Sequence, residues 1–518
     1  MEDNVRAEQL VTAIAQAIQG QVDASTLTKA LYSTDASNYR VVPQVVVFPR
    51  DSADLVAIGD IARQFEVPVT MRGAGTSCAG NAVGPGIVVD TSRHLGRILD
   101  IDLAGRTARV QPGAVMDSLQ RLVMPHGLRF GPDPSTHSRC TFGGMIGNNA
   151  CGNHAVAYGR TADNVISLSL IDGRGRHIEA KAGDLSAVPG LAELVAANLA
   201  TIRTEFGRFR RQISGYGLDH LLPEKSGDLA KALVGSEGTL GLVTEAELRL
   251  VPLAANPVLL VLGYPTLPDA ADAVPALLPL KPLAVEGLDA RLVEVYKRHG
   301  GTVPDLPEGG AWLMVEFSEA AAAEAAAAVA DTNQRRTLVS GTEVRAMWRL
   351  REEGAGLGGR TPHGHQGWPG FEDAAVPPDN LGSYLRDFNR LLDEFKLEGL
   401  PYGHLGDGCV HIRIDFPFER GSKVFRRFMR AAGELVVEHD GSLSGEHGDG
   451  RARSELLELM YSSAAVELMG RFKGLFDPLN LMNPGVKVNP VALDADLRRP
   501  AARAIKARGG FAWREDGG

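Results

Sequence analysis

Hydrophobic and polar positions along the chain predict short strands and helices in an irregular alternation. Residues 8–31 have a helical pattern, and the apolar run 41–50 (VVPQVVVFPR), bounded by prolines, is typical of a strand. A helix is predicted over 54–66, with a strand directly after it (VPVTMR). From there to about residue 250 short strands predominate, with predicted hairpins at 97–114 and 165–180. This order indicates an α+β fold rather than a regular βαβ winding.

A second cycle of strand and helix begins at residues 256–280, where Pro- and Ala-rich composition marks a boundary near residue 255. Within this cycle, residues 311–336 predict a strand followed by an alanine-rich helix, with Ser318 as its N-cap. The last residues carry many arginines and few apolar anchors, which is typical of a tail or a cut linker. We therefore expect an N-terminal helical segment 1–34, a first domain 35–255, a second domain 256–488 and a tail 489–518.

Composition and charge place the chain among ordinary globular proteins. Its 518 residues are 44% hydrophobic and 23% charged, and the net charge of −9 argues against a nucleic-acid surface. The acidic start MEDNVRAEQL lacks the apolar core of a signal peptide, and no run of eighteen apolar residues predicts a membrane span. The cysteines lack C-x-x-C spacing, so the sequence predicts free thiols in a reducing compartment rather than disulfides or iron–sulfur ligands: Cys78, Cys140, Cys151 and Cys409.

A glycine-rich loop, RGAGTSCAG (72–80), follows the strand VPVTMR. Its glycines permit turns in which backbone N–H groups converge on an anion such as a pyrophosphate. The dinucleotide fingerprint G-x-G-x-x-G fails because Cys78 stands at the sixth position and no helix follows, so the alternative of a tight surface turn stays open. Two further Gly-rich stretches, 132–159 and 235–250, suit close backbone approach to a flat ligand.

Histidines and acidic residues gather in GHLGDGCVH (403–411) and GEHGDGR (445–451). Strict alternation in CVHIRIDF predicts a strand with His411 and Arg413 on its polar face, and the GDG turn folds His404 back toward it. Two imidazoles with the carboxylate of Glu446 form a common set of ligands for a divalent metal, most often zinc, and His447 remains as a base. The alternative is that these histidines only cap loops and form hydrogen bonds in the core.

Together the three Gly-rich segments resemble the FAD-binding domain of the vanillyl-alcohol-oxidase and p-cresol-methylhydroxylase superfamily, over about residues 35–250. The resemblance implies a two-subdomain FAD-binding domain followed by an α+β substrate (cap) domain with an antiparallel sheet. Because the first loop contains no histidine, non-covalent FAD is expected. The residues that the resemblance assigns to cofactor contact are Arg72, Gly73, Ala74, Gly75, Thr76, Ser77, Pro132, Asp133, Ser135, Gly143, Gly144, Gly147, Asn148, Gly152, Gly238 and Val243.

The two histidine motifs and FDPLNLMNPGVKV (476–488) resemble the C-terminal domain of FAD-linked D-lactate, glycolate and D-2-hydroxyglutarate dehydrogenases. The resemblance implies the metal ligands His404, His411 and Glu446, the base His447 and, as the residue that binds the substrate carboxylate, Arg351. Arg413 stands where D-2-hydroxyglutarate enzymes carry asparagine, and Phe371 or Glu372 where they carry lysine. The form of the GHLGDGCVHIRIDF motif is most similar to long members fused to a C-terminal iron–sulfur domain.

These features predict a dehydrogenase that oxidises a D-2-hydroxy acid, with metal-assisted deprotonation and hydride transfer to flavin N5. Arg413, on the His411 face, is expected to bind the same carboxylate as Arg351 or a second one. The expected electron acceptor is an iron–sulfur domain, a quinone or an electron-transfer protein. The expected location is cytoplasmic or peripheral to the inner face of a membrane, and homo-oligomerisation is left open. Three alternatives stay open: a flavin oxidase of another alcohol that uses oxygen, a metal-dependent hydrolase without flavin, and a non-catalytic FAD-binding subunit.

Overall fold

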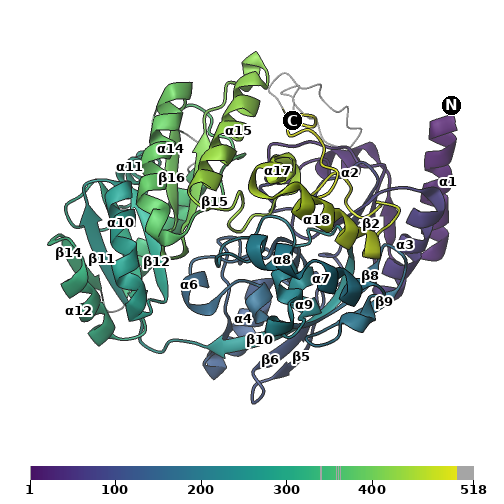
Figure 1. Cartoon of the computed structure of the whole chain (residues 1–518), viewed down its shortest axis with the longest axis horizontal. Coiled ribbons are helices and arrows are strands. Elements are labelled where there is room, and N and C mark those ends of the chain that lie inside the picture. Colours follow the sequence, from purple (N-terminus) through teal and green to yellow (C-terminus); the bar gives the residue numbers. More distant parts are fainter. Residues whose placement is uncertain (1, 339–340, 358, 360, 362, 499–518) are drawn as a thin grey trace.

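The computed structural model describes residues 2–338, 341–357, 359, 361 and 363–498, and these residues form three β-sheets with helices packed on them (Figure 1). The first sheet contains, in spatial order, β1 (Gln21–Asp23), β2 (Val45–Phe48), β4 (Ile87–Asp90) and β3 (Val69–Arg72). The strands β2, β4 and β3 are parallel, and β1 is antiparallel to β2. Apolar side chains of this sheet share one core with α1 (Glu2–Ala17) and α3 (Ser52–Phe65).

The single helix predicted over residues 8–31 is wrong in its middle. The helix α1 ends at Ala17, and β1 and α2 (Thr26–Leu31) follow. The carboxylate of Asp54 accepts a hydrogen bond from the backbone N–H of Gly20, and a Cβ at Gly20 would collide with a backbone carbonyl of β2. These tertiary contacts turn the chain into the sheet and outweigh the local helical propensity.

The second sheet is antiparallel, and both predicted hairpins are present in it. It contains, in spatial order, β5 (Ile98–Asp102), β6 (Thr107–Val110), β10 (Gly241–Pro252), β8 (Val165–Asp172) and β9 (His177–Ala180), with β7 (Leu128–Phe130) paired to the end of β10. The helices that belong to this part are α4 (Met116–Val123), α5 (Phe142–Asn148), α6 (Ala155–Tyr158), α7 (Leu191–Ala197), α8 (Leu199–Glu205) and α9 (Leu229–Leu233).

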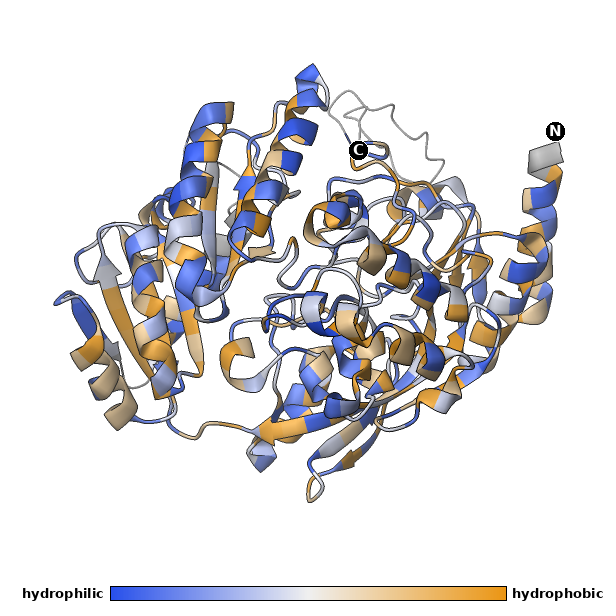
Figure 2. Ribbon diagram, in the orientation of Figure 1, coloured by the Kyte–Doolittle hydropathy of each residue, from blue (hydrophilic) through white to orange (hydrophobic). Residues whose placement is uncertain are grey.

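The third sheet is also antiparallel, as predicted for the second domain. Its spatial order is β14 (Arg335–Leu338), β11 (Val258–Tyr264), β13 (Ala311–Phe317), β12 (Ala284–Asp289), β16 (Gly399–His404), β17 (Cys409–Ile414) and β15 (Ala374–Ala375). One face packs with α10 (Leu267–Leu277), α12 (Ala320–Val329), α14 (Leu381–Phe395) and α15 (Lys423–Glu438), and the other with α11 (Ala290–Arg298) and α13 (Thr342–Leu357). Figure 2 shows polar and apolar residues along α14 and α15, as expected of helices that cover a sheet on one side.

Two smaller features complete this part of the fold. The prediction of Ser318 as N-cap of α12 is wrong, because the chain stays extended for one more residue and Glu319 occupies the cap without a side-chain hydrogen bond. None of the helices in the described part of the chain is long and apolar enough to cross a membrane.

After the third sheet the chain returns to the first two. The helices of this return are α16 (Gly450–Arg453), α17 (Leu457–Met460) and α18 (Ser463–Phe476). The buried ammonium group of Lys487 lies 2.8 Å from a carboxylate oxygen of Glu237 and 2.7 Å from one of Asp449, which ties the return to the loop before β10. Of the predicted tail, residues 489–498 lie near Tyr39, whose hydroxyl donates to the carbonyl of Leu493, while 499–518 fall outside the described residues.

His154, at the start of α6, joins the second and third sheets. Its Nε2 lies 2.7 Å from a carboxylate oxygen of Glu316 on β13, and its Nδ1 is bonded to Asp133, which also pairs with Arg129 at 3.0 Å. Burial disfavours the charged imidazole and Arg129 also opposes it, but Asp133 and Glu316 outweigh both and raise the pKa of His154 to about 9. The ring of His154 also lies near that of Trp348 of α13, with centroids 6.0 Å apart and an interplanar angle of 30°.

We expect His154→Gln to reduce stability in a pH-dependent way. Because the pKa of His154 is raised on folding, its contribution is complete below about pH 6.5 and is lost as the pH rises through about 9. The shift corresponds to on the order of 3 kcal/mol. Urea unfolding of both proteins at pH 6 and near pH 10 should show a lower free energy of unfolding for the variant at pH 6 only. His137→Gln, which changes a half-buried histidine paired with Asp117, is the control. An equal loss of unfolding free energy in His137→Gln, or a loss in His154→Gln that does not change with pH, would contradict this assignment.

Candidate active site

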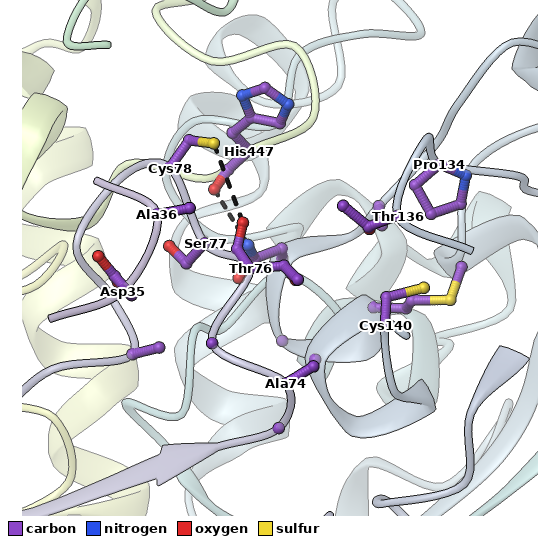
Figure 3. A pocket seen from close by; sticks show the side chains of 18 of the residues that line it. Asp35, Ala36, Ala74, Thr76, Ser77, Cys78, Pro134, Thr136, Cys140 and His447 are labelled. Atoms are coloured by element: carbon purple, nitrogen blue, oxygen red, sulfur yellow. Dashed lines mark hydrogen bonds between the residues drawn. The ribbon is translucent and has the colours of Figure 1, made fainter. Parts of the chain in front are cut away.

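A cavity of about 870 Å³ lies between the ends of the three sheets. Arg72 at the end of β3, Val243 on β10 and His411 on β17 all line it. The glycine-rich loop forms one wall, and Figure 3 shows Thr76 of this loop near His447. The volume is within the range of about 300–1,000 Å³ for sites that hold cofactors and other small ligands.

Most of the residues predicted to contact the cofactor line this cavity: Arg72, Gly73, Ala74, Gly75, Thr76, Ser77, Ser135, Gly143, Gly144, Gly147, Asn148, Gly238 and Val243. Three others, Pro132, Asp133 and Gly152, are not part of its lining. Asp133 is engaged by Arg129 and His154, and Gly152 donates its backbone N–H to Glu446 Oε2 at 2.8 Å. These residues lie in the framework around the cavity, and their contact with the cofactor stays a prediction.

The backbone of the glycine-rich loop leaves room for a ligand. Gly75 has a φ of +68°, which side chains rarely adopt, and a Cβ at Gly73 would collide with the hydroxyl of Thr141. Across the cavity, a Cβ at Gly147 would have only a backbone atom of Glu237 within reach, at 3.9 Å. The glycine-rich loop thus presents bare backbone to the cavity, an arrangement that fits the pyrophosphate and flat ring of a flavin nucleotide.

His404, His411 and Glu446 meet deep in the cavity, as the sequence predicts for a metal set. His404 ends β16 and His411 lies on β17, and the tight turn between the two strands brings them onto one side. Their Nε2 atoms lie 3.2 and 3.1 Å from Glu446 Oε1, and all three side chains are buried. One donor atom from each lies within 4.8 Å of the others, so the chemistry and spacing of this set fit a divalent cation.

Neighbouring charges hold Glu446 in its ionised form. Burial disfavours a charge on Glu446, but the surrounding imidazoles, first that of His404, hold its pKa well below the usual range. Burial also opposes a charge on His404, while Glu286 and Glu446 raise its pKa to about 9. The fully buried Arg211 pairs with Asp407 at 2.8 Å and with Glu446 at 3.3 Å. Glu446 is therefore held as a carboxylate that a cation can bind.

His447 lies beside this cluster and is oriented by Glu372. Its Nδ1 lies 2.9 Å from Glu372 Oε2, and its ring stacks on that of His411 with centroids 4.8 Å apart. Its Nε2 lies 3.4 Å from Glu446 Oε1. Burial opposes a charge on His447, but Glu372 and Asp373 raise its pKa well above the ordinary value. The contact with Glu372 orients the ring through Nδ1, and Nε2 faces the cluster.

The predicted substrate-binding arginines also line the cavity. Arg351 of α13 is 3% exposed, its Nη2 lies 2.7 Å from Glu286 Oε2, and its Nε has no hydrogen-bond partner among the described residues. Arg413 of β17 makes no ion pair with any residue in the described part of the chain. Both guanidinium groups are thus available to an anion in the cavity.

The sequence-based prediction missed the acidic residues that hold the site together, above all Glu286. This fully buried residue of β12 bridges the site, with Oε1 2.8 Å from His404 Nδ1 and Oε2 bound to Arg351. Glu372 was noted only as a difference from the family pattern. Both stand inside otherwise apolar segments, LAVEGL and GFEDAAV, and a carboxylate buried in such a run is a signal that could have identified them.

Comparisons with known proteins agree with this geometry. Residues 43–181 match the family described as FAD binding domain, and residues 253–486 match FAD linked oxidases, C-terminal domain. D-lactate dehydrogenase of Archaeoglobus fulgidus is 32% identical over 85% of this chain and 90% of that protein. D-2-hydroxyglutarate dehydrogenase of Pseudomonas putida is 34% identical over 91% of this chain and 51% of its own length, so this chain spans about half of that relative.

A solved structure shows the same fold at low sequence identity. The 4-ethylphenol oxidase from Gulosibacter chungangensis superposes with a TM-score of 0.66 at 14% identity, covering 93% of this chain and 97% of that one. The predicted architecture, an FAD-binding domain followed by an α+β domain with an antiparallel sheet, is confirmed. Because both family regions are present and the archaeal relative is covered almost from end to end, the chain belongs to the family of FAD-linked oxidases that includes the D-lactate and D-2-hydroxyglutarate dehydrogenases.

Proposed function

We propose that this protein is an FAD-dependent dehydrogenase that oxidises a D-2-hydroxy acid to the 2-oxo acid. The observation that carries the proposal is one cavity whose walls combine a glycine-rich loop, a cluster of two histidines and a glutamate, a further histidine and two arginines. The names of the relatives support the same substrate class. When bound, a flavin supplies a hydride acceptor and a divalent cation at His404, His411 and Glu446 lowers the pKa of the substrate hydroxyl.

In this proposal Arg351 binds the substrate carboxylate. Its planar guanidinium group matches a carboxylate, and Glu286 holds one of its nitrogens while the Nε has no hydrogen-bond partner among the residues that the structure describes. The same Glu286 holds His404, so the residue that binds the carboxylate and a residue of the metal set share one support. A 2-hydroxy acid carries its hydroxyl on the carbon next to the carboxylate, and this shared support would fix the spacing between the two.

His447 takes the hydroxyl proton in this proposal. Glu372 holds Nδ1, so Nε2 faces the cluster to which the hydroxyl would bind. The carboxylates of Glu372 and Asp373 favour the imidazolium, so His447 acts as the base from its neutral form, which a cation bound at the adjacent Glu446 would favour. Removal of the hydroxyl proton raises electron density on the substrate and favours departure of a hydride from C2.

Anaerobic mixing of the FAD-loaded protein with D- and L-2-hydroxy acids tests this proposal. We expect D-lactate or D-2-hydroxyglutarate to bleach the flavin, with the L-enantiomers much slower. Because the experiment reads flavin reduction without any acceptor, the result does not depend on oxygen. Bleaching only by alcohols without a carboxylate would favour the oxidase alternative. A purified protein without yellow colour would favour the hydrolase, and a yellow protein whose flavin is bleached by none of these substrates would favour a non-catalytic subunit.

We expect Arg413→Ala to discriminate between diacid and monoacid substrates. Arg413 lines the cavity on the same strand as His411, where a second carboxylate of a longer substrate would lie. Loss of a charged hydrogen bond costs about 1.5–3 kcal/mol. The KM for D-2-hydroxyglutarate should therefore rise about 10- to 100-fold, and that for D-lactate only about two- to threefold. Steady-state kinetics on both acids measure the ratio, and equal increases would remove this role for Arg413.

We expect Glu286→Ala to weaken binding of a divalent metal by about 10- to 100-fold, because the carboxylate orients His404 through Nδ1. Dialysis followed by metal analysis gives the affinity without reference to turnover. A matched control is Glu316→Ala. It also removes a buried glutamate, from the adjacent strand β13, but Glu316 contacts His154 and not the metal set. If both variants lost metal equally, general destabilisation rather than orientation of His404 would be the cause.

A further inference from the structure

Cys78 of the glycine-rich loop lies beside His447 and Glu372. One donor atom from each of the three residues lies within 4.8 Å of the other two. Cys78 and His447 line the cavity, and Figure 3 shows them side by side, with the Cys78 thiol in contact with the carbonyl oxygen of Thr76 at 3.9 Å. Glu372 is only 5% exposed and lies behind them. The three side chains come from distant parts of the sequence, so only the fold brings them together.

We propose that Cys78, Glu372 and His447 form a second cation site, for a soft divalent ion of the zinc class, that withdraws His447 from turnover when filled. A thiolate, an imidazole and a carboxylate are a set that zinc-class ions favour over magnesium or calcium, and the cavity leaves a fourth position for water. A thiolate and a carboxylate together would balance the charge of a dication. The loss of turnover rests on the role proposed for His447, whereas binding of the ion does not.

The surroundings of the three residues are compatible with such an ion. Glu372 Oε2 bonds His447 Nδ1 at 2.9 Å, and Arg453 lies 3.5 Å from the other oxygen, Oε1. The cation would compete with the first of these contacts and leave the second in place. Burial raises the pKa of the Cys78 thiol, so the ion displaces a proton when it binds. The stacked rings of His411 and His447 place this site next to the cluster of His404, His411 and Glu446.

The experiment uses the full chain with FAD bound and one equivalent of divalent metal already added. Excess Zn²⁺ or Mg²⁺ is supplied, a small alkylating reagent is added, and the modification of each cysteine is followed by peptide mass spectrometry. We expect Zn²⁺ to slow alkylation of Cys78 about tenfold or more and Mg²⁺ to leave it unchanged. Cys140 is the internal control. It lines the same cavity but belongs to no cluster of potential metal ligands among the described residues, so its alkylation should not respond to Zn²⁺.

The second arm follows anaerobic flavin reduction by substrate in the presence of excess Zn²⁺, relative to each variant's own rate without it. We expect inhibition in the parent protein and in Cys140→Ser, and a loss of this inhibition in Cys78→Ser. Absence of selective protection of Cys78, or equal protection by Mg²⁺, overturns the site. Protection of Cys78 without inhibition overturns the proposed inhibition and counts against His447 as the base. The alkylation experiment still tests ion binding even if the protein reduces no flavin.

Discussion

His447→Gln is expected to lower the rate of flavin reduction by a D-2-hydroxy acid about 10²- to 10⁴-fold, the usual contribution of a general base. Glutamine preserves much of the volume of histidine and can still bond Glu372, but it cannot accept the hydroxyl proton. The rate constant at saturating substrate should therefore fall, while the substrate concentration at half-saturation should change little. Anaerobic stopped-flow measurement of flavin absorbance gives both values.

Two controls separate this effect from structural damage. His154→Gln changes another partly buried histidine that contacts two carboxylates but lies outside the cavity lining, and it should leave flavin reduction within about threefold of the parent rate at pH 7. In His447→Gln the FAD content, and the content of metal bound at one equivalent by His404, His411 and Glu446, should equal those of the parent protein, because His447 belongs to neither of these two sets. A reduction in rate of less than about threefold would exclude His447 as the base.

Arg351→Met is expected to lower the rate of flavin reduction at low substrate concentration about 10²- to 10³-fold, because it removes one partner of a buried charged pair with the substrate. The change also leaves Glu286 without its ion pair to Arg351, which lies at 2.7 Å in the parent protein. Arg351→Lys should recover only part of the rate, since an ammonium group cannot form the paired hydrogen bonds of guanidinium. The dependence of the stopped-flow rate on substrate concentration measures the loss.

A neutral substrate identifies the cause of that loss. If Arg351 binds the carboxylate, a primary alcohol of similar size that lacks it should react slowly and equally with the parent protein and with Arg351→Met. Arg139→Met serves as the matched control, because Arg139 also lines the cavity but is distant in sequence from the metal cluster and from α13. Equal losses in the two arginine variants would indicate a general effect of positive charge on the cavity rather than a specific contact with the carboxylate.

Local patterns in the sequence determined several features of this protein. The alternation in CVHIRI predicts a strand with His411 and Arg413 toward the cavity, and β17 has this form. The glycine-rich loop was predicted to approach a ligand, and its residues line the cavity. The turn between β16 and β17 places His404 beside His411, as predicted. These features depend on residues close together in the chain, so their geometry follows from strand periodicity and turn chemistry.

Other features were decided only by tertiary structure. The helix predicted over 8–31 breaks because contacts from α3 and β2 outweigh local propensity. Asp133 pairs with His154, whose other nitrogen contacts Glu316 far along the chain. The supports of the site, Glu286 and Glu372, are marked in the sequence only by their apolar neighbours, and they acquire their roles through burial next to His404 and His447. Burial and long-range pairing set the cost of a charge, and a linear pattern does not contain that information.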